Sequence, residues 1–238
     1  MLKKIKAFIP QHMKNRTVLK FYGWLCRYTG AISKQKIAQH AERNKKELAK
    51  NPIYLQKNPF IENQAEWGKI VFGTGKKADM AHSGCGIIAV YNALKALGEK
   101  VSPDMMAMLI SSFERHGAIF SGKLGTAPNA IYDYFIENGY DAIQTDSSDT
   151  NKLNEIGAAY DVAIVTAYND KYDITEQIHT ICITENDRGE YVLHNAYYRL
   201  NGQWAQKCTE QYALGEAIKK IGANAAVICV VGVCRKIV

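Results

Sequence analysis

Cys85 has surroundings that suit a catalytic nucleophile. It lies between two glycines, directly before an apolar run with helical spacing. This order predicts a helix that begins at Cys85 and ends near Leu97, because Gly98 follows as a stop signal. The partial positive charge at a helix N-terminus favours the thiolate over the thiol. A structural place in the core is the more frequent fate of an isolated cysteine, so the rest of the chain must decide.

A cysteine nucleophile needs an imidazole to accept its proton and a third group to orient that imidazole. His179 opens the first strand of a predicted β-hairpin, and Asn195 ends the second. A turn centred near residue 187 would place His179 and Asn195 opposite each other, close enough to interact. Asn195 would then hold one imidazole nitrogen while the other faces Cys85, and strand alternation would turn His194 to the opposite face. The alternative is an ordinary polar pair at the edge of a sheet.

The elements that would carry these residues change type along the chain. Helical periodicity dominates up to about residue 160, and strand periodicity dominates after it. Ser102 and Pro103 are a typical N-cap and first residue of a helix. This segregation of helices and strands predicts an α+β domain. The predicted helices are 85–97, 103–116, 128–138, 150–160 and 211–221, and the predicted strands are 162–168, 179–184, 190–195 and 225–233.

The first sixty residues differ from the rest in charge. They hold 14 Lys and Arg against Glu42 and Glu47, a net charge of +12, whereas residues 61–238 hold 16 against 21, a net charge of −5. We therefore expect a basic, helical arm over 1–60 and a separate domain over 61–238. The arm could contact an anionic membrane surface or an acidic partner, cover the cleft, or pack against the domain as a belt. A nucleic acid is a less favoured partner than a membrane surface or an acidic protein.

Several classes of protein are disfavoured by simple features of the sequence. Six cysteines are present, but none forms a CxxC pair and no Cys/His cluster has zinc-ligand spacing, so we expect a reducing compartment, no metal and no cofactor. We expect a cytoplasmic protein, able to associate with a membrane through its arm, because no signal peptide or long apolar run is found. The segment 117–124 nearly matches a P-loop, but Leu124 stands where a hydroxyl must bind Mg²⁺.

An ordered set of short motifs resembles the bacterial papain-like cysteine peptidases related to the domains that process double-glycine bacteriocin leaders. The resemblance runs from about Gln64 to the C-terminus. It implies a papain-like fold, a peptide or protein substrate, and Cys85, His179 and Asn195 as nucleophile, base and orienting residue. The motifs are Gln64-Ala65-Glu66-Trp67, Ser83-Gly84-Cys85-Gly86, Gly98-Glu99-Lys100-Val101-Ser102-Pro103, Gly125-Thr126, Gly139-Tyr140, His179 and Asn195.

Two features depart from that family. The family typically places an oxyanion-hole glutamine shortly before the cysteine, but Asp79 stands six residues before Cys85, and a carboxylate would repel an oxyanion. Gln64 could take this role if residues 68–80 form an inserted loop, with the Cys85 N–H as second donor. The 94 residues between Cys85 and His179 are fewer than in papain, which favours the bacterial branch.

The sequence thus predicts a thiol-dependent hydrolase that cleaves a peptide or amide bond. The same residues can also perform acyl transfer or deamidation, because fold does not fix the reaction. A non-catalytic papain-like binding module is the remaining alternative.

Overall fold

The computed structural model describes most of the chain after residue 31. The basic residues before position 21 and most of the aromatic segment 17–28 lie outside the described residues, so the predictions for the first part of the arm stay predictions. The described residues are 21, 24, 25, 32–51, 60–75, 77–122, 125–169, 178–197, 199–209, 211–222 and 226–235.

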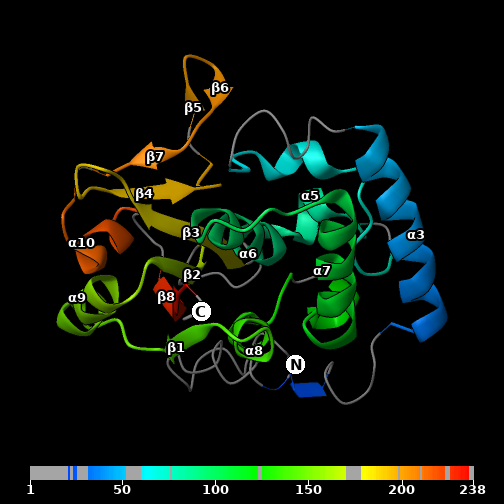
Figure 1. The fold of residues 1–238 in the computed structure, drawn as a ribbon, viewed down its shortest axis with the longest axis horizontal. Coiled ribbons are helices and arrows are strands. Elements are labelled where there is room, and N and C mark those ends of the chain that lie inside the picture. Colours follow the sequence, from blue (N-terminus) through cyan, green and yellow to red (C-terminus); the bar gives the residue numbers. More distant parts are fainter. Residues whose placement is uncertain are drawn as a thin grey trace, which may run out of the picture.

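The fold is built on a six-stranded antiparallel sheet (Figure 1). Its strands run in the order β1-β8-β2-β3-β4-β7, so the last long strand lies inside the sheet. Every residue of β2 is buried because neighbouring strands and both sheet faces enclose it. The bounds are β1 Asp141–Thr145, β2 Val162–Tyr168, β3 Ile178–Glu185, β4 Tyr191–His194, β7 Lys207–Cys208 and β8 Ala226–Cys234, and a separate pair joins β5 Arg199–Leu200 to β6 Gln203–Trp204.

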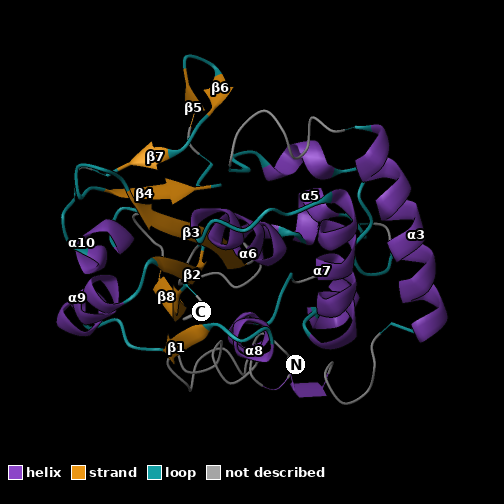
Figure 2. Cartoon of the chain, viewed as in Figure 1, coloured by secondary structure: helices purple, strands orange, loops and turns teal. Residues whose placement is uncertain are grey.

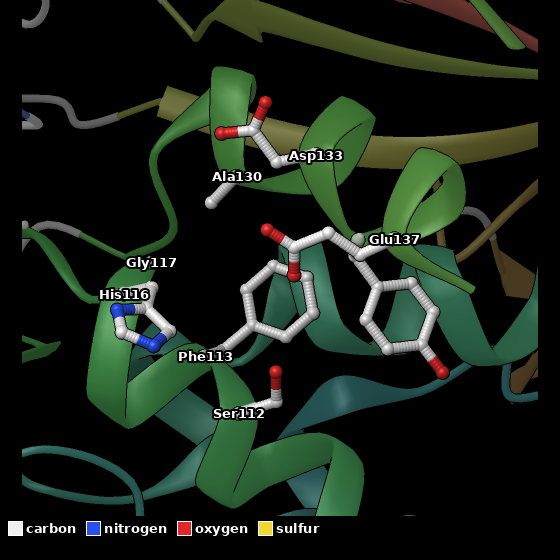
Figure 3. A pocket seen from close by; sticks show the side chains of 8 residues that line it. Ser112, Phe113, His116, Gly117, Ala130, Asp133 and Glu137 are labelled. Atoms are coloured by element: carbon white, nitrogen blue, oxygen red, sulfur yellow. The ribbon is translucent and has the colours of Figure 1, made fainter.

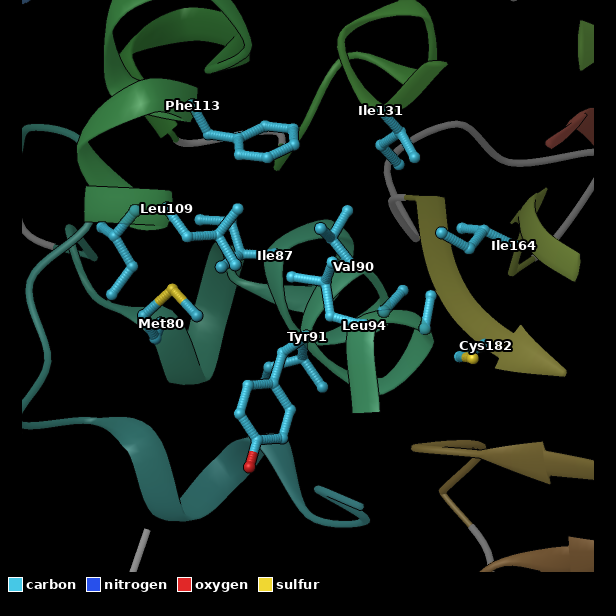
Figure 4. Packing of buried hydrophobic residues seen from close by; sticks show 14 of the residues in the cluster. Met80, Ile87, Val90, Tyr91, Leu94, Leu109, Phe113, Ile131, Ile164 and Cys182 are labelled. Carbon is cyan, nitrogen blue, oxygen red and sulfur yellow. The ribbon is translucent and has the colours of Figure 1, made fainter. Parts of the chain in front are cut away.

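Helices cover both faces of this sheet (Figure 2). On one face lie α6 Cys85–Ala96, α7 Pro103–His116 and α8 Pro128–Glu137, and on the other lie α9 Thr150–Ala159 and α10 Leu214–Ile218. Strand alternation divides the core accordingly. Ile164 and Cys182 pack with the α6 side (Figure 4), whereas Val165 and Ile181 pack with α9 and α10.

The helix α6 is the central element of the larger cluster, and the first ten of its residues are all buried. Both glycines beside Cys85 are required by close contacts. A Cβ on Gly84 would lie 2.5 Å from the Met80 carbonyl oxygen, and a Cβ on Gly86 would lie 2.6 Å from the Thr126 Cβ. These small residues let α6 begin at Cys85 in a crowded place.

The helix α3, Lys34–Lys50, packs along α7 and is therefore not a free arm. His40 Nδ1 lies 2.6 Å from Glu114 Oε1 on α7. Asn44 donates to the Val71 carbonyl at 2.8 Å and accepts from the Val71 N–H. Of the roles left open for residues 1–60, packing as a belt describes this part, and the helical prediction is confirmed for it.

Most of the predicted elements are confirmed. Ser102 accepts from the Met105 N–H as N-cap of α7, with Pro103 in the first turn. The predicted helix 211–221 is too long, because the Gln211 carbonyl instead accepts from the Tyr191 N–H at the sheet edge. The α+β class is confirmed. Within the described ranges, no helix is long and apolar enough to cross a membrane.

Candidate active site

The hairpin of β3 and β4 has a different register from the predicted one. Cys182 pairs with His194, and Glu185 pairs with Tyr191, so the turn is centred on residue 188. The expected pairing of His179 with Asn195 is therefore wrong. The observed turn, 186–190, lies one residue later than the predicted one, and Asn186 Oδ1 closes it by accepting the N–H groups of both Arg188 and Glu190.

His179 and Asn195 nevertheless meet, through an atom that the sequence did not suggest. His179 Nε2 lies 2.7 Å from the main-chain carbonyl oxygen of Asn195. Asn195 has a φ of 59°, which turns its carbonyl out of the strand direction. Because a carbonyl only accepts, Nε2 carries the proton and Nδ1 of the neutral ring is the unprotonated nitrogen. Among the described residues, none hydrogen-bonds to this Nδ1.

The side chain of Asn195 is directed to Gln64 rather than to His179. Its Oδ1 accepts from the Gln64 N–H at 3.1 Å, and its Nδ2 donates to Gln64 Oε1 at 3.3 Å. Gln64 begins the 3-10 helix η1, Gln64–Trp67, and its Nε2 donates to the Ala81 carbonyl at 2.9 Å. The structure thus joins two of the predicted site residues to each other and to the segment that precedes Cys85.

Cys85 begins α6 and is 5% exposed. Burial raises the pKa of its thiol, and the N–H and hydroxyl of Thr180 and the N–H groups of Cys85 and Gly86 partly oppose this rise. The side chain that faces the thiol from β3 is thus Thr180, directly after His179. Within the described part of the chain, the thiol and the His179 ring form no direct hydrogen bond.

Tyr197 connects the surroundings of the two residues. Its ring stacks on the His179 ring with centroids 4.3 Å apart. Tyr197 is 51% exposed, and partial desolvation of its hydroxyl, followed by the negative charge that Cys85 can carry, raises its pKa to about 12. The Tyr197 ring therefore lies against His179 and within electrostatic range of Cys85.

The titration of the two residues makes the resting site neutral. Burial lowers the pKa of His179 to about 4, although the Asn195 carbonyl favours the protonated ring. The thiol pKa is raised at the same time. At neutral pH the site thus holds a thiol and an uncharged imidazole, not a thiolate–imidazolium pair.

Two hydroxyl groups beside Cys85 lack hydrogen-bond partners among the described residues. Ser83 Oγ is buried two positions before the cysteine, and Thr126 Oγ1 is buried against Gly86. At Gly125, the place of a Cβ is 3.6 Å from the Ser83 carbonyl oxygen and 3.9 Å from Cys85 Sγ, so the loop 125–126 lies directly over the helix start. Buried polar groups without partners are rare, so these two hydroxyls distinguish the surroundings of Cys85.

Asp79 is explained as a helix cap. Its side chain accepts from the His82 N–H at 2.9 Å as N-cap of α5, Met80–Ser83, and contacts His82 Nδ1 at 2.8 Å. The carboxylate at the position of the expected glutamine is therefore engaged with the turn before Cys85.

A buried network beside the site was not predicted. The Glu62 carboxylate contacts His194 and the Asn195 N–H. His194 pairs with Cys182 in the sheet and is 1% exposed. No sequence pattern pointed to Glu62, because it lies 132 residues from His194 and in an irregular segment.

A cavity elsewhere in the described structure is too small to be an alternative site. It lies between α7 and α8, has a volume of ≈ 20 Å³ and is lined by residues such as Phe113, His116 and Glu137 (Figure 3). This is room for about one water molecule. In the described ranges, no three His, Cys, Asp or Glu side chains are grouped to hold a metal ion.

No family model, curated protein or solved structure matches this chain. The resemblance to papain-like peptidases therefore rests on the residues quoted above, and function must be argued from the site.

Proposed function

We propose that the protein is a thiol-dependent hydrolase of papain-like fold that cleaves a peptide or amide bond, with Cys85 as nucleophile and His179 as base. The observation that carries the proposal is the tautomer of His179. The Asn195 carbonyl fixes the proton on Nε2 and leaves Nδ1 as the basic nitrogen. This is the division of roles between the two ring nitrogens that a catalytic imidazole needs.

The reaction follows from these assignments. When Cys85 Sγ attacks the acyl carbon, Nδ1 of His179 accepts the thiol proton, and the Asn195 carbonyl stabilises the imidazolium through Nε2–H. The Cys85 N–H and the Gln64 amide donate to the oxyanion, because Gln64 Nε2 has a second hydrogen beside the one given to Ala81. Nδ1 then returns the proton to the leaving amine, and water cleaves the thioester in the reverse sequence of proton transfers.

The neutral resting site leaves the imidazole free to accept a proton, although its lowered pKa makes it a weaker base than an ordinary histidine. An imidazole with a pKa near 4 is unprotonated, and so available as base, at any pH above about 5. Proton transfer from the thiol requires a contact between Cys85 Sγ and His179 Nδ1 in the reacting complex, because none of the described hydrogen bonds joins them at rest.

A non-catalytic binding module is the second candidate, and the burial of the thiol favours it. Cys85 is 5% exposed, with a raised pKa, which are the properties of an inert cysteine. In that case the unpartnered Ser83 and Thr126 hydroxyls would bind a peptide that is released unchanged.

The experiment that separates the two compares wild type, Cys85→Ala and Cys208→Ala on a mixture of peptides, read by mass spectrometry. Cys208 is the exposed matched control. Hydrolase activity predicts product with wild type and Cys208→Ala, and none with Cys85→Ala. Retention of all cleavage in Cys85→Ala contradicts the proposal, and binding without any product in all three proteins supports the module.

A further inference from the structure

The Glu62 carboxylate bridges two parts of the site region. It is 7% exposed, with Oε1 2.7 Å from His194 Nδ1 and Oε2 2.9 Å from the Asn195 N–H. His194 Nε2 lies 2.9 Å from Thr184 Oγ1, and its ring stacks on Phe60 with centroids 4.0 Å apart. Burying a carboxylate is costly unless its oxygens are paired, and both oxygens of Glu62 are.

Asn195 is held in place by contacts on three sides. Its N–H is held by Glu62, its side chain by Gln64, and its carbonyl receives His179 Nε2. Its left-handed backbone is uncommon for a non-glycine residue, although asparagine adopts it more readily than most, and these three contacts hold it there. The Glu62 contact is the one that fixes the N–H side of this residue.

We propose that Glu62 is a positioning residue, which orients the His179 ring by holding the Asn195 main chain in its left-handed conformation. The inference rests on the proposed function for its effect on catalysis, but its effect on His179 can be measured without catalysis. Among the contacts of the described residues, Glu62 bonds to neither Cys85 nor His179, so we expect its effect on His179 to pass through Asn195.

Two substitutions separate the bonds of Glu62. Glu62→Leu removes the acceptor for the Asn195 N–H. Glu62→Gln keeps one oxygen for that N–H, and its NH₂ must then meet His194 Nδ1 as acceptor, which moves the His194 proton to Nε2, where Thr184 Oγ1 can accept it. Glu62→Gln therefore preserves Asn195 and changes only the tautomer of His194.

The matched control is Glu114, a second buried carboxylate that contacts a histidine and a backbone N–H. Glu114 Oε1 lies 2.6 Å from His40 Nδ1 and 2.8 Å from the Gly73 N. None of these residues contacts the site residues through any bond shown for the described chain. Glu114→Leu thus disturbs the core to a similar degree without reaching Asn195.

The test is long-range ¹H–¹⁵N NMR of the histidine rings, with Cys85-dependent hydrolysis as a second readout. We expect a protected His179 Nε2–H in wild type, Glu62→Gln and Glu114→Leu, and its loss in Glu62→Leu, with hydrolysis about tenfold to a hundredfold lower, as expected for a misplaced base. Glu62→Gln should also show His194 protonated on Nε2.

An unchanged His179 signal in folded Glu62→Leu overturns the inference. If Glu62→Leu does not fold, Glu62→Gln provides the test. Loss of its His179 Nε2–H signal together with an unchanged His194 tautomer would also contradict the inference. If no protein shows hydrolysis but the His179 signal behaves as expected, the proposed function fails and the positioning inference stands.

Discussion

Two buried glutamate–histidine pairs in this protein have nearly the same local design. Glu114 on α7 contacts Nδ1 of His40, and Glu62 contacts Nδ1 of His194. Each carboxylate also accepts one backbone N–H, from Gly73 in the first case and from Asn195 in the second. Chemistry and burial alone therefore do not distinguish them.

The pairs differ in how their oxygens are used and in what they hold. Both bonds of Glu114 fall on Oε1, and Oε2 has no hydrogen-bond partner among the described residues. Glu62 uses one oxygen for each bond, and its N–H partner is the residue whose carbonyl receives His179. The first pair attaches α3 to the domain and the second supports the candidate site, so a buried pair has to be interpreted from its partners.

The largest expected difference between the two regions is in catalysis. His179→Gln should lower Cys85-dependent hydrolysis by about 10²–10⁴-fold, because it removes the general base. His40→Gln should leave the rate within about threefold, because His40 touches only the α3–α7 contact. The measurement is the initial rate on a cleaved peptide, and a comparable loss in both variants would erase the functional distinction.

Stability should respond strongly to breaking the α3–α7 pair. His40→Ala leaves the Glu114 carboxyl buried with neither oxygen paired to a histidine, and we expect the free energy of unfolding to fall by about 3 kcal/mol. Urea unfolding followed by circular dichroism measures this. A loss below about 0.5 kcal/mol would show that α3 is held by its apolar residues alone.

The contributions of His179 and Glu114 to the free energy of unfolding should change with pH in opposite directions. Burial lowers the pKa of His179 from 6.5 to about 4, so its contribution to stability is present above pH 6.5 and is lost as the pH falls toward 4. The shift corresponds to about 3 kcal/mol, which His179→Gln should abolish. Burial raises the pKa of Glu114, so its contribution is instead present at low pH and is lost as the pH rises through the raised pKa.

Unfolding curves of wild type, His179→Gln and Glu114→Gln at pH 4 to 8 check both signs. His179→Gln should flatten the acid side of the stability profile, and Glu114→Gln should remove a decline at higher pH. Profiles that change in the same direction for both variants would contradict the assigned burial effects.

The smallest effect is expected at Asn195. Glycine accepts its φ of 59° without strain and keeps the carbonyl, but loses the side-chain bonds to Gln64. Asn195→Gly should therefore lower hydrolysis by less than about tenfold, the value of one or two hydrogen bonds. If Asn195→Gly lowers hydrolysis as much as His179→Gln does, the Asn195 side chain rather than its carbonyl orients the imidazole.

The sequence was sufficient for the elements that carry the site. The apolar runs of β2, β3 and β8 and the cap at Ser102 are local signals, and the structure confirms them. The predicted register of the hairpin was wrong by two residues, because the turn is centred one residue later and Asn186 Oδ1 accepts the Glu190 N–H within it. A side-chain bond within a turn leaves no periodic pattern to detect.

The remaining errors concern long-range contacts. The φ angle of Asn195 determines whether its side chain or its main-chain carbonyl accepts the hydrogen bond from His179 Nε2. Asparagine can adopt this positive φ, but the sequence alone does not show that it does so here. The partnerships of Glu62 and Glu114 span 132 and 74 residues, and nothing in their neighbourhoods distinguishes them from exposed acids. Such contacts arise from packing and require coordinates.

The central claim is that His179 Nδ1 takes the proton from Cys85, and the pH dependence of Cys85 alkylation by iodoacetamide tests it most directly. With His179 as base, the wild-type rate should reach a plateau above the His179 pKa of about 4. His179→Gln should instead react only as free thiolate, with a rate that rises about tenfold per pH unit toward the raised thiol pKa. Two parallel profiles, both rising with that slope up to pH 9, would contradict the claim.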